Sequence, residues 1–294
     1  MGIVGSTVMT RMTSSRRCFL ASAAGALSAA AVLPLRGADA VKVGMVPDAG
    51  ATQVSVEEKA PLRDYLAKAV GTKVELIIPT NYNATVEALG NGSLDFAYLG
   101  ALTYVKAHDR YNVIPLVQRS ADKNFHSLFI TQSGSAIHKL ADCKGKRFAF
   151  GDINSTSGHL IPFDELKKAG INADDDMQIR YTGSHAATVK AVEGGAADAG
   201  ALDETVYRSM ISEGKVDGSK VRIFVTSPSF VDYVWVARKD VGASQRAGFA
   251  KAFLSLKEGK DDAILNILRG KDFVAADDAE YANIRKIARD LKML

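Results

Sequence analysis

The sequence predicts an α/β fold in two similar lobes, each a mixed sheet flanked by helices. Three observations support this prediction. Short β-like runs alternate with helical runs, the second half of the chain repeats the first, and strand-like segments in the middle and near the end are placed to carry the chain between lobes. Alternation of this kind is typical of α/β domains.

The first half of the chain alternates strands and helices at the spacing of βα units. The predicted elements are, in order, strand 41–46, helix 60–70, strand 74–78, helix 84–89 and strand 94–99. Gly71 follows the first helix directly, which is a common helix end. This order indicates parallel strands with helices covering both faces of the sheet.

An internal repeat relates the two halves of the chain at an offset of 103 residues. Within residues 84–104, eight of 21 positions carry the same residue 103 positions later. These pairs are Ala84/Ala187, Thr85/Thr188, Val86/Val189, Ala88/Ala191, Gly92/Gly195, Asp95/Asp198, Leu99/Leu202 and Tyr104/Tyr207. A fixed offset predicts a duplicated unit of helix, glycine turn, aspartate and buried strand. The alternative is that any two βα units share such turn and strand residues without being repeats of one unit.

The C-terminal part of the chain is predicted to return to the first lobe. The predicted bounds are 41–126 with 229–294 for the first lobe and 127–228 for the second. Ligands of open α/β sheets bind beyond the carboxyl ends of the strands. In a two-lobed protein that region lies between the lobes, so we expect them to close around a ligand.

Two further expectations concern the connections and the tail. Residues 126–131, together with 221–225 or 233–238, are predicted strands that cross between the lobes. The tail from Gln245 to Leu294 is predicted to be helical and polar-faced, and to pack on the first lobe.

Residues 1–40 are predicted to be an export signal. Arg16 and Arg17 precede an alanine-rich apolar run over 19–35, and residues 38–40 fit a small-x-small cleavage site. The run is shorter than the roughly 20 residues of a membrane span. The paired arginines match the twin-arginine export pattern, with an ordinary secretory signal as the alternative. Cys18 precedes the apolar run, so we expect a periplasmic protein without a membrane anchor.

The predicted mature chain is nearly neutral. The leader holds four arginines and one aspartate, so the 37 basic and 33 acidic residues of the full chain become 33 and 32, a net charge of +1. Without a basic block, nucleic acid is not an expected partner. Only Cys143 remains, which excludes an internal disulfide, and the 254 residues left are enough for a hydrophobic core.

The segment from Arg147 to Pro162 is the strongest local signal of a binding site. It reads as a strand, a turn, and then Ser155-Thr156-Ser157-Gly158 at the start of a helix. A helix N-terminus offers unpaired N–H groups and a partial positive charge, which bind anions. A plain N-cap, the alternative, needs a single hydroxyl. In the repeat, Thr52 lies opposite Ser155, so each lobe is expected to present a polar helix start.

Further candidate ligands lie at the predicted strand tips. His185 follows the predicted strand 178–182, and Tyr82 is its counterpart in the first lobe, so both are candidate hydrogen-bond donors to the anion. A solvated surface histidine is the alternative for His185. Asp203 and Asp232 are candidates of another kind, because a carboxylate repels an ionised anion but accepts a hydrogen bond from P–OH. The alternative for each aspartate is a turn or N-cap role.

Enzymatic and metal functions are not expected. The sequence lacks a G-x-S-x-G elbow, an H-E-x-x-H motif and a Walker loop. Its five histidines are not spaced as metal ligands, so no cofactor or metal is expected. Cys143 lies in a polar turn, where neighbouring lysines would lower the pKa of its thiol, although we expect an incidental surface cysteine.

These segments resemble the phosphate, phosphite and phosphonate-binding subunits of ABC importers. The resemblance covers the mature chain and is most specific over Gly151–Pro162, with further matches at 183–185, 198–203 and 232–235. It implies a type II periplasmic binding protein: two α/β lobes, a two-strand hinge, a small oxyanion ligand and an ABC permease partner in the inner membrane. It also implies that the Ser-Thr-Ser run, the histidine, and residues matching Tyr82 and Asp232 line the cleft.

One departure from the family pattern bears on the ligand. Phosphonate binders tend to read Ala-Trp-Tyr-Gly where this chain has Ala97-Tyr98-Leu99-Gly100, which makes Tyr98 a candidate cleft residue. The following residues resemble the phosphite-type subgroup, which favours phosphite, phosphate or a small phosphonate over an aminoalkylphosphonate. The alternative function is a periplasmic oxyanion sensor, for example of arsenite or phosphate, that signals to a membrane histidine kinase.

Overall fold

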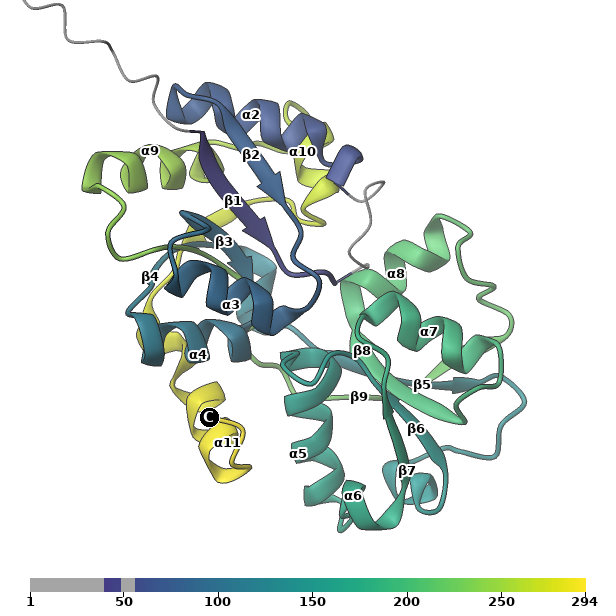
Figure 1. Ribbon diagram of the computed structural model, residues 1–294. Helices are drawn as coiled ribbons and strands as arrows, with labels where there is room; N and C mark the ends of the chain where they lie inside the picture. Colours follow the sequence, from purple (N-terminus) through teal and green to yellow (C-terminus); the bar gives the residue numbers. More distant parts are fainter. Residues whose placement is uncertain (1–39, 49–55) are drawn as a thin grey trace, which may run out of the picture. The chain divides into compact units, whose positions relative to one another are not determined.

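The computed structural model describes residues 40–48 and 56–294 as two mixed sheets flanked by helices (Figure 1). The first sheet has six strands in the order β11-β4-β10-β3-β1-β2, and the second has five in the order β7-β6-β8-β5-β9. We call each sheet with its helices the first lobe and the second lobe. The two mixed sheets confirm the predicted fold class.

The first lobe contains the chain up to β4 and everything from β10 onward. Its strands are β1 (Val41–Met45), β2 (Val74–Ile77), β3 (Phe96–Leu99), β4 (Ile114–Arg119), β10 (Val234–Ala237) and β11 (Phe273–Ala275). Its helices are α2 (Ala60–Val70), α3 (Tyr82–Gly90), α4 (Ala101–Tyr111), α9 (Ala243–Leu254), α10 (Asp262–Ile267) and α11 (Ala282–Asp290), with the 3₁₀ turn η4 (Asp278–Tyr281).

The second lobe contains the middle of the chain. Its strands are β5 (Ser127–Gln132), β6 (Arg147–Phe150), β7 (Gln178–Tyr181), β8 (Ala199–Asp203) and β9 (Val221–Thr226). Its helices are α5 (Ile161–Lys168), α6 (Ala173–Asp176), α7 (His185–Glu193) and α8 (Glu204–Ser212), with the 3₁₀ turn η2 (Leu140–Cys143) and a π-helical turn η3 (Thr156–Leu160). A further 3₁₀ turn, η1 (Ser120–Asn124), precedes β5.

Local sequence features explain where α2 begins and ends, and aromatic residues fill the core of the first lobe. α2 starts with a proline in its first turn and ends at Gly71, whose φ of 72° suits a residue without a side chain. β1 pairs in parallel with β2 and β3, whereas β10 runs antiparallel to β3 and β4. Phe96 of β3 stacks on Phe249 of α9 with ring centroids 4.0 Å apart, and Trp235 packs beside them. These aromatic side chains form much of the first core.

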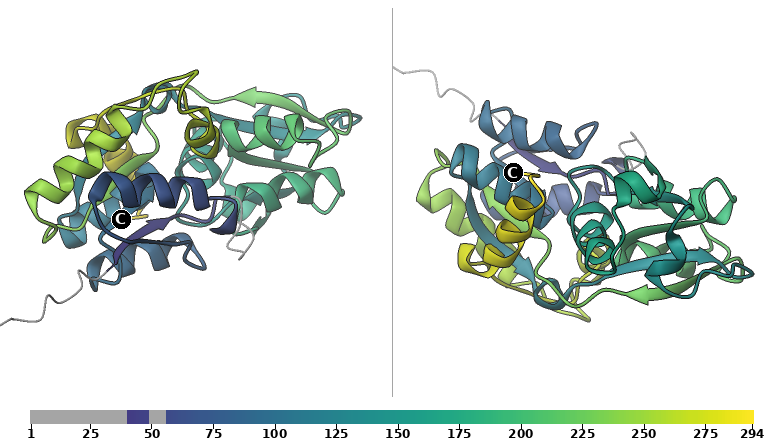
Figure 2. Two further views of the ribbon diagram at one scale, coloured as in Figure 1. Left: turned by 90° about the horizontal axis from the view of Figure 1, so that it is seen from above. Right: turned by 90° about the horizontal axis from the view of Figure 1, so that it is seen from below.

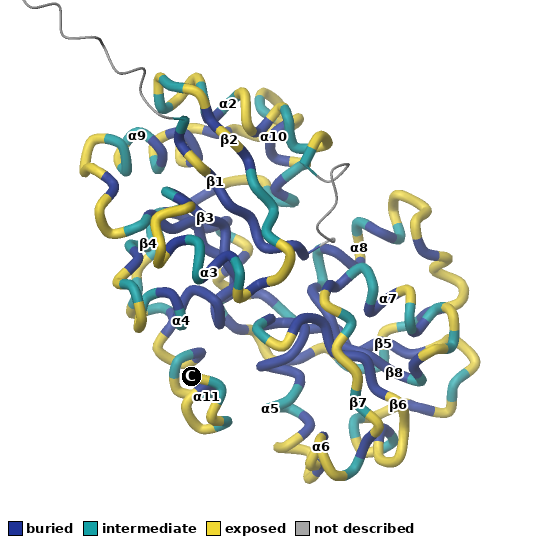
Figure 3. The backbone as a smooth tube through the Cα atoms, viewed as in Figure 1, coloured by how far each residue is buried: buried dark blue, intermediate teal, exposed yellow. Residues whose placement is uncertain are grey.

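The sequence repeat is confirmed as a structural repeat. α3 and α7 begin at Tyr82 and His185, which are 103 positions apart, and β3 and β8 begin at the same offset. In each unit a glycine with positive φ, Gly92 or Gly195, makes the turn between helix and strand. Both strands are buried along their whole length (Figure 3).

The aspartates of the repeat have the same structural role in both lobes. Asp95 Oδ2 accepts a hydrogen bond from Lys42 N at 2.9 Å, and Asp198 Oδ2 accepts one from Arg147 N at 2.9 Å. In each case the carboxylate fixes the start of the neighbouring strand. The repeated aspartate is therefore a structural residue.

The prediction that strands 126–131, together with 221–225 or 233–238, cross between the lobes was wrong in detail. β10, in the range 233–238, pairs with β3 and β4 inside the first sheet. β5 and β9 pair with each other inside the second sheet. The crossing segments lie just outside these strands and are joined by an antiparallel bridge between Phe125 and Phe230, with both N–H to O=C distances 2.9 Å. They run side by side between the sheets in both views of Figure 2.

The C-terminal tail also differs from the prediction. It packs on the first lobe as expected, but it is not wholly helical. β11 adds an edge strand antiparallel to β4, with Val274 opposite Gln118. α11 then covers α4, so the tail completes both the sheet and one helical layer of the first lobe (Figure 1).

Candidate functional site

The three hydroxyl residues that follow β6 lie buried at the start of η3 and α5. Ser155 caps the turn, because its Oγ accepts a hydrogen bond from Gly158 N at 3.0 Å. Thr156 Oγ1 accepts one from Leu102 N of the first lobe at 2.9 Å. Ser157 Oγ is buried and has no hydrogen-bond partner. The N-cap role therefore holds for Ser155, while Ser157 is left with its hydroxyl available.

The first turn of this segment is π-helical, which is rare and often found at functional sites. Gly158 comes close to His185: a Cβ at this glycine would lie 3.0 Å from the imidazole Cε1. Gly151 N donates to Gly158 O at 2.9 Å, which ties the two ends of the loop together. Because Gly158 has no side chain, the segment Ser155–Ser157, which we call the hydroxyl loop, lies close to His185.

His185 is buried at the start of α7 and is not a surface residue. Its Nδ1 accepts a hydrogen bond from Asp203 N at 3.3 Å, and its Nε2 lies 3.4 Å from Tyr233 Oη. Because Nδ1 accepts, the proton of the neutral ring belongs on Nε2. Burial lowers the pKa of His185, although the nearby Asp203 and Asp48 act to raise it. The histidine is thus a neutral donor at physiological pH.

Two tyrosines of the first lobe were predicted to lie at the site. Tyr82 begins α3 and is buried, and its Oη has no hydrogen-bond partner. Burial is the main cause that raises its pKa, followed by the charges of Asp48, Asp152, Asp203 and Asp232. Tyr98 of β3 is also buried with an unpartnered Oη, but its ring stacks on Tyr233 at 4.9 Å between centroids. Tyr98 therefore supports Tyr233.

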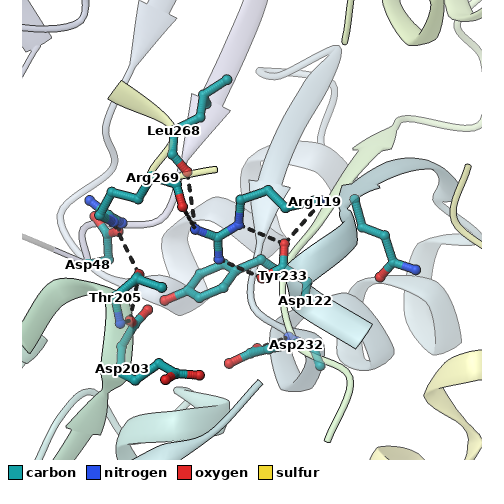
Figure 4. A network of polar contacts seen from close by, with 12 residues as sticks. Asp48, Arg119, Asp122, Asp203, Thr205, Asp232, Tyr233, Leu268 and Arg269 are labelled. Carbon is teal, nitrogen blue, oxygen red and sulfur yellow. Dashed lines mark hydrogen bonds and ion pairs between the residues drawn. The ribbon is translucent and has the colours of Figure 1, made fainter. Parts of the chain in front are cut away.

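Asp203 and Asp232 each keep one oxygen free. Asp203 caps α8, where its Oδ1 accepts from Val206 N at 2.9 Å and Thr205 Oγ1 at 2.7 Å, while its Oδ2 is buried and unpartnered. Asp232 Oδ1 accepts from Ala101 N at 3.0 Å, and its Oδ2 is likewise buried without a partner. Figure 4 shows both carboxylates on the same side of the Tyr233 ring. The alternative of an N-cap role holds for Asp203 Oδ1 and leaves a second oxygen available.

The two carboxylates have opposite protonation tendencies. Burial raises the pKa of Asp232 to about 7, against the hydrogen bond from Ala101 that lowers it. Burial also acts to raise the pKa of Asp203, but the charge of His185 when it is protonated, together with the charges of Arg269 and Arg119, outweighs burial and holds that pKa below its usual value. At neutral pH the site therefore contains one ionised and one partly protonated carboxyl group.

The nearby arginines are already paired with other carboxylates. Arg119 is fully buried, with its Nε 2.8 Å from Asp122 Oδ2, and Arg269 forms an ion pair with Asp48 (Figure 4). The site thus combines neutral hydroxyl and imidazole donors with free carboxylate oxygens. Such a set suits a small anion that brings its own protons.

Three residues near the site, Tyr233, Arg119 and Arg269, were not predicted from the sequence. One predicted residue, Thr52, lies outside the described residues. Tyr233 was seen only as part of an apolar strand, although its position next to Asp232 was a usable signal. Arg119 and Arg269 had no motif that could have marked them, because their partners are distant in sequence. Thr52 lies in the segment 49–55, outside the residues that the structure describes.

The expectation that Cys143 is a surface residue was wrong. Its side chain is 0% exposed and belongs to the core of the second lobe with Phe129, Phe148 and Leu166. Burial raises the pKa of its thiol to about 12, which opposes any activation by the neighbouring lysines. The 3₁₀ turn η2 turns this residue inward although its sequence neighbours are polar. Cys143 is therefore a small core residue.

None of the helices among residues 40–48 and 56–294 is long and apolar enough to span a membrane.

Comparison with known proteins places the chain in a family. Residues 43–281 match the family described as ABC transporter, phosphonate, periplasmic substrate-binding protein. A probable ABC transporter phosphite binding protein, PhnD1 of Prochlorococcus marinus (strain MIT 9301), is 32% identical over 86% of this chain and 90% of its own length. The phosphonates-binding periplasmic protein of Escherichia coli (strain K12) is 25% identical over 78% of this chain and 70% of its own.

A solved structure supports the same assignment. The structure of PhnD1 from Prochlorococcus marinus in complex with methylphosphonate has a TM-score of 0.80 and 31% identity, and the match covers 87% of this chain and 99% of that one. Because this family consists of transport binding proteins, the chain is a binding protein and not an enzyme. The chain therefore belongs to the periplasmic substrate-binding proteins of phosphonate-type ABC transporters.

Proposed function

We propose that this protein captures a small, protonated phosphorus oxyanion, namely phosphite, phosphate or a small phosphonate, and delivers it to an ABC permease in the inner membrane. The observation that carries the proposal is a set of buried polar atoms without partners: Ser157 Oγ, Tyr82 Oη, Asp203 Oδ2 and Asp232 Oδ2. Buried polar groups are nearly always hydrogen-bonded in folded proteins, so a group of them points to a ligand.

The proposed ligand contacts divide by chemistry. Ser157, Tyr82 and His185 donate neutral hydrogen bonds to ionised oxygens, and the helix start at Ser155 and Thr156 adds a partial positive charge. Asp203 accepts a hydrogen bond from P–OH, and Asp232 accepts or donates according to its protonation. Tyr98 belongs to the proposed site as an aromatic neighbour. Thr52, which lies outside the described residues, stays in the proposed site as the counterpart of Ser155 in the sequence repeat.

The carboxylates explain selectivity within this proposal. A fully ionised anion such as sulfate places negative charge beside Asp203 and has no proton to offer. Forms of phosphate, phosphonate and phosphite that carry a P–OH group are present near neutral pH, and this group satisfies the free Oδ2 atom. The names of the relatives agree with this choice of ligand class, since they include phosphite, phosphate and phosphonate binders.

Export is part of the same proposal. We propose that residues 1–40 are a signal, of the twin-arginine type, cleaved near Ala40, that the mature protein has no membrane anchor, and that the lobes comprise 41–126 with 229–294 and 127–228. The comparisons give no support to the alternative of a sensor for a histidine kinase.

Calorimetry on the mature protein tests the proposal. The panel is phosphite, phosphate, methylphosphonate, 2-aminoethylphosphonate, sulfate and arsenite, titrated into wild type and into Ser155→Ala/Thr156→Ala/Ser157→Ala. We expect micromolar or tighter binding of at least one phosphorus anion, weak binding of sulfate, and a loss of at least about 100-fold in the triple variant.

The matched control is Ser212→Ala/Ser219→Ala, which removes two exposed hydroxyls elsewhere in the second lobe. This control should bind like wild type. Absence of binding to every phosphorus anion, or a triple variant as tight as wild type, would contradict the proposed ligand or site.

A further inference from the structure

Hydrogen bonds join the two lobes along two edges of the site. On one edge, Thr156 Oγ1 accepts from Leu102 N at 2.9 Å, and Lys106 Nζ donates to Asn154 Oδ1 at 2.7 Å. These contacts connect α4 of the first lobe with the hydroxyl loop of the second. They therefore form part of the site already described.

The opposite edge is joined through one arginine. Arg269, just after α10 of the first lobe, donates from Nε to Thr205 Oγ1 of the second lobe at 3.3 Å. Its Nη2 forms an ion pair with Asp48, whose backbone O accepts from His185 N at 3.1 Å. Figure 4 shows Arg269 between Asp48 and Thr205. Both partners of Arg269 thus lead to the second lobe, Thr205 directly and Asp48 through the backbone of His185.

Thr205 connects this edge to the ligand site. The hydroxyl of Thr205 donates to Asp203 Oδ1 at 2.7 Å while it accepts from Arg269. A hydroxyl has one proton and two acceptor positions, so it can serve both partners at once. Arg269 is therefore one hydrogen bond removed from a carboxylate whose other oxygen is free.

The backbone of Arg269 is held rigidly in the first lobe. Arg119 donates from Nη1 to the carbonyl oxygens of Leu268 and Arg269, each at 3.1 Å, and is itself fixed by its buried ion pair with Asp122. Arg269 has a φ of 50°, a conformation that residues other than glycine seldom adopt. Such a conformation persists only where the surroundings enforce it, often near functional sites.

We propose that Arg269 is a closing latch: its guanidinium, anchored to Asp48 in the first lobe, holds Thr205 of the second lobe and thereby keeps the lobes closed over the anion. Arg269 is a positioning residue and does not contact the ligand. The inference rests on the proposed function. Because the latch contact joins lobes that separate when ligand leaves, its loss should accelerate ligand release far more than it slows ligand entry.

Two substitutions test the latch from its two sides. Arg269→Lys keeps a positive charge beside Asp48 but loses the second donor that reaches Thr205. Thr205→Val removes the hydroxyl and keeps the shape, and Thr205→Ser restores the hydroxyl. The matched control is Arg238→Lys, because Arg238 pairs with Asp95 and Asp240 inside the first lobe only.

The experiment is stopped-flow kinetics on the mature protein with phosphite and methylphosphonate. The reporter is the fluorescence of Trp235, the only tryptophan in the chain, which packs on Tyr98 at 5.0 Å between ring centroids. Dissociation is followed after mixing with excess Trp235→Phe protein, which traps free ligand and adds no tryptophan signal. Circular dichroism verifies that each variant is folded, and the double variant Arg269→Lys/Thr205→Val completes a double-mutant cycle.

We expect each single variant to release ligand about ten times faster than wild type, with association changed less than about twofold. The double variant should be no faster than the singles, because both act through one hydrogen bond, and Thr205→Ser should restore slow release. Wild-type release rates in Arg269→Lys and Thr205→Val, or strictly multiplicative effects in the double variant, would overturn the latch alone. Failure of wild type to bind either anion would overturn the proposed function, and the latch with it.

Discussion

The first turns of α4 and α8 occupy matching places in the two lobes but are capped in different ways. α8 carries its own cap: Asp203 precedes it, and Oδ1 of this residue accepts hydrogen bonds from the N–H groups of Thr205 and Val206. Its N-terminus is therefore complete within the second lobe. Asp203 lies 103 positions after Gly100, the residue that precedes α4.

α4 has no cap of its own, because Gly100 lacks a side chain. Its first N–H groups are satisfied from elsewhere: Ala101 N donates to Asp232 Oδ1 at 3.0 Å, and Leu102 N donates to Thr156 Oγ1 at 2.9 Å. Thr156 belongs to the second lobe. The start of α4 is therefore complete only while that lobe is in place.

This difference shows how a duplicated unit is adapted to bind between lobes. The second lobe has a self-contained cap, whereas the first lobe has a glycine at the matching position, which leaves room for Asp232 and Thr156. The glycine thus allows the Asp232 carboxylate and the Thr156 hydroxyl, from distant segments, to meet at the start of α4.

The largest effect is expected from Gly100→Asp, which gives α4 the residue that α8 has. A Cβ at Gly100 would lie 3.2 Å from Thr156 Oγ1 and 3.4 Å from Asp232 Oδ1. A new carboxylate would thus be buried beside an existing one, which should lower the free energy of unfolding by about 4 kcal/mol at pH 7. Urea denaturation measures this.

Gly100→Ala is the control for that substitution. It introduces the Cβ without the carboxylate, and we expect a loss of about 1 kcal/mol. Equal losses in the two variants, or a gain of stability from the introduced cap, would show that charge at this place does not distinguish the two helix starts.

The next effect concerns pH. Because the folded protein raises the pKa of Asp232 to about 7, the unfolded chain gives up this proton at lower pH than the folded protein does. The group's contribution to stability is thus full below about pH 4 and falls as pH rises towards 7, by roughly 4 kcal/mol at most. Asp232→Asn should remove this decline, so the variant gains on wild type as pH rises.

Asp203→Asn should behave in the opposite sense. The pKa of Asp203 is lowered in the folded protein, so its carboxylate contributes stability above its unfolded pKa that is lost as pH falls through the folded value. Asparagine retains a cap but not the charge. Urea denaturation at several pH values between 3 and 8 compares the two variants, and matching pH profiles would contradict the assigned protonation states.

A smaller effect is expected from Thr156→Val. The substitution removes the acceptor for Leu102 N and leaves the shape unchanged, which should lower the free energy of unfolding by about 1–2 kcal/mol. Thr156→Ser restores the acceptor and should recover most of that loss. If valine and serine are equally stable in thermal denaturation, the interlobe cap contributes nothing.

The smallest effect tests where the two lobes are alike. Asn81 caps α3 through Ala84 N at 2.8 Å, and Ser184 caps α7 through Ala187 N at 3.2 Å, again 103 positions apart. Asn81→Ala and Ser184→Ala should each cost about 1 kcal/mol in urea denaturation. A cost in one lobe only would contradict the equivalence of the repeated units.

The fold and the local structure around several candidate site residues were predictable because they depend on local patterns. Alternating apolar runs predict the sheets, and the repeat offset alone identifies Tyr82 and His185 as counterparts. Ser155 to Ser157 form a helix start in sequence and in structure. These features depend on interactions between residues that are close in the chain, so they can be predicted from the sequence.

The remainder depends on contacts between distant segments. No local pattern tells that Asp232 caps a helix 131 positions earlier, or that Arg269 reaches Thr205. Cys143 was misjudged because its polar neighbours hide a turn that directs it into the core. The places of these residues are determined by tertiary packing, which local sequence patterns do not reveal.

The most direct test of the central claim is a crystal structure of the mature protein grown with phosphite. We predict one anion between the lobes, within hydrogen-bond distance of Ser157 Oγ, Tyr82 Oη and His185 Nε2, with a protonated oxygen facing Asp203 or Asp232. An anion bound elsewhere, with these atoms still unpartnered in the closed protein, would contradict it.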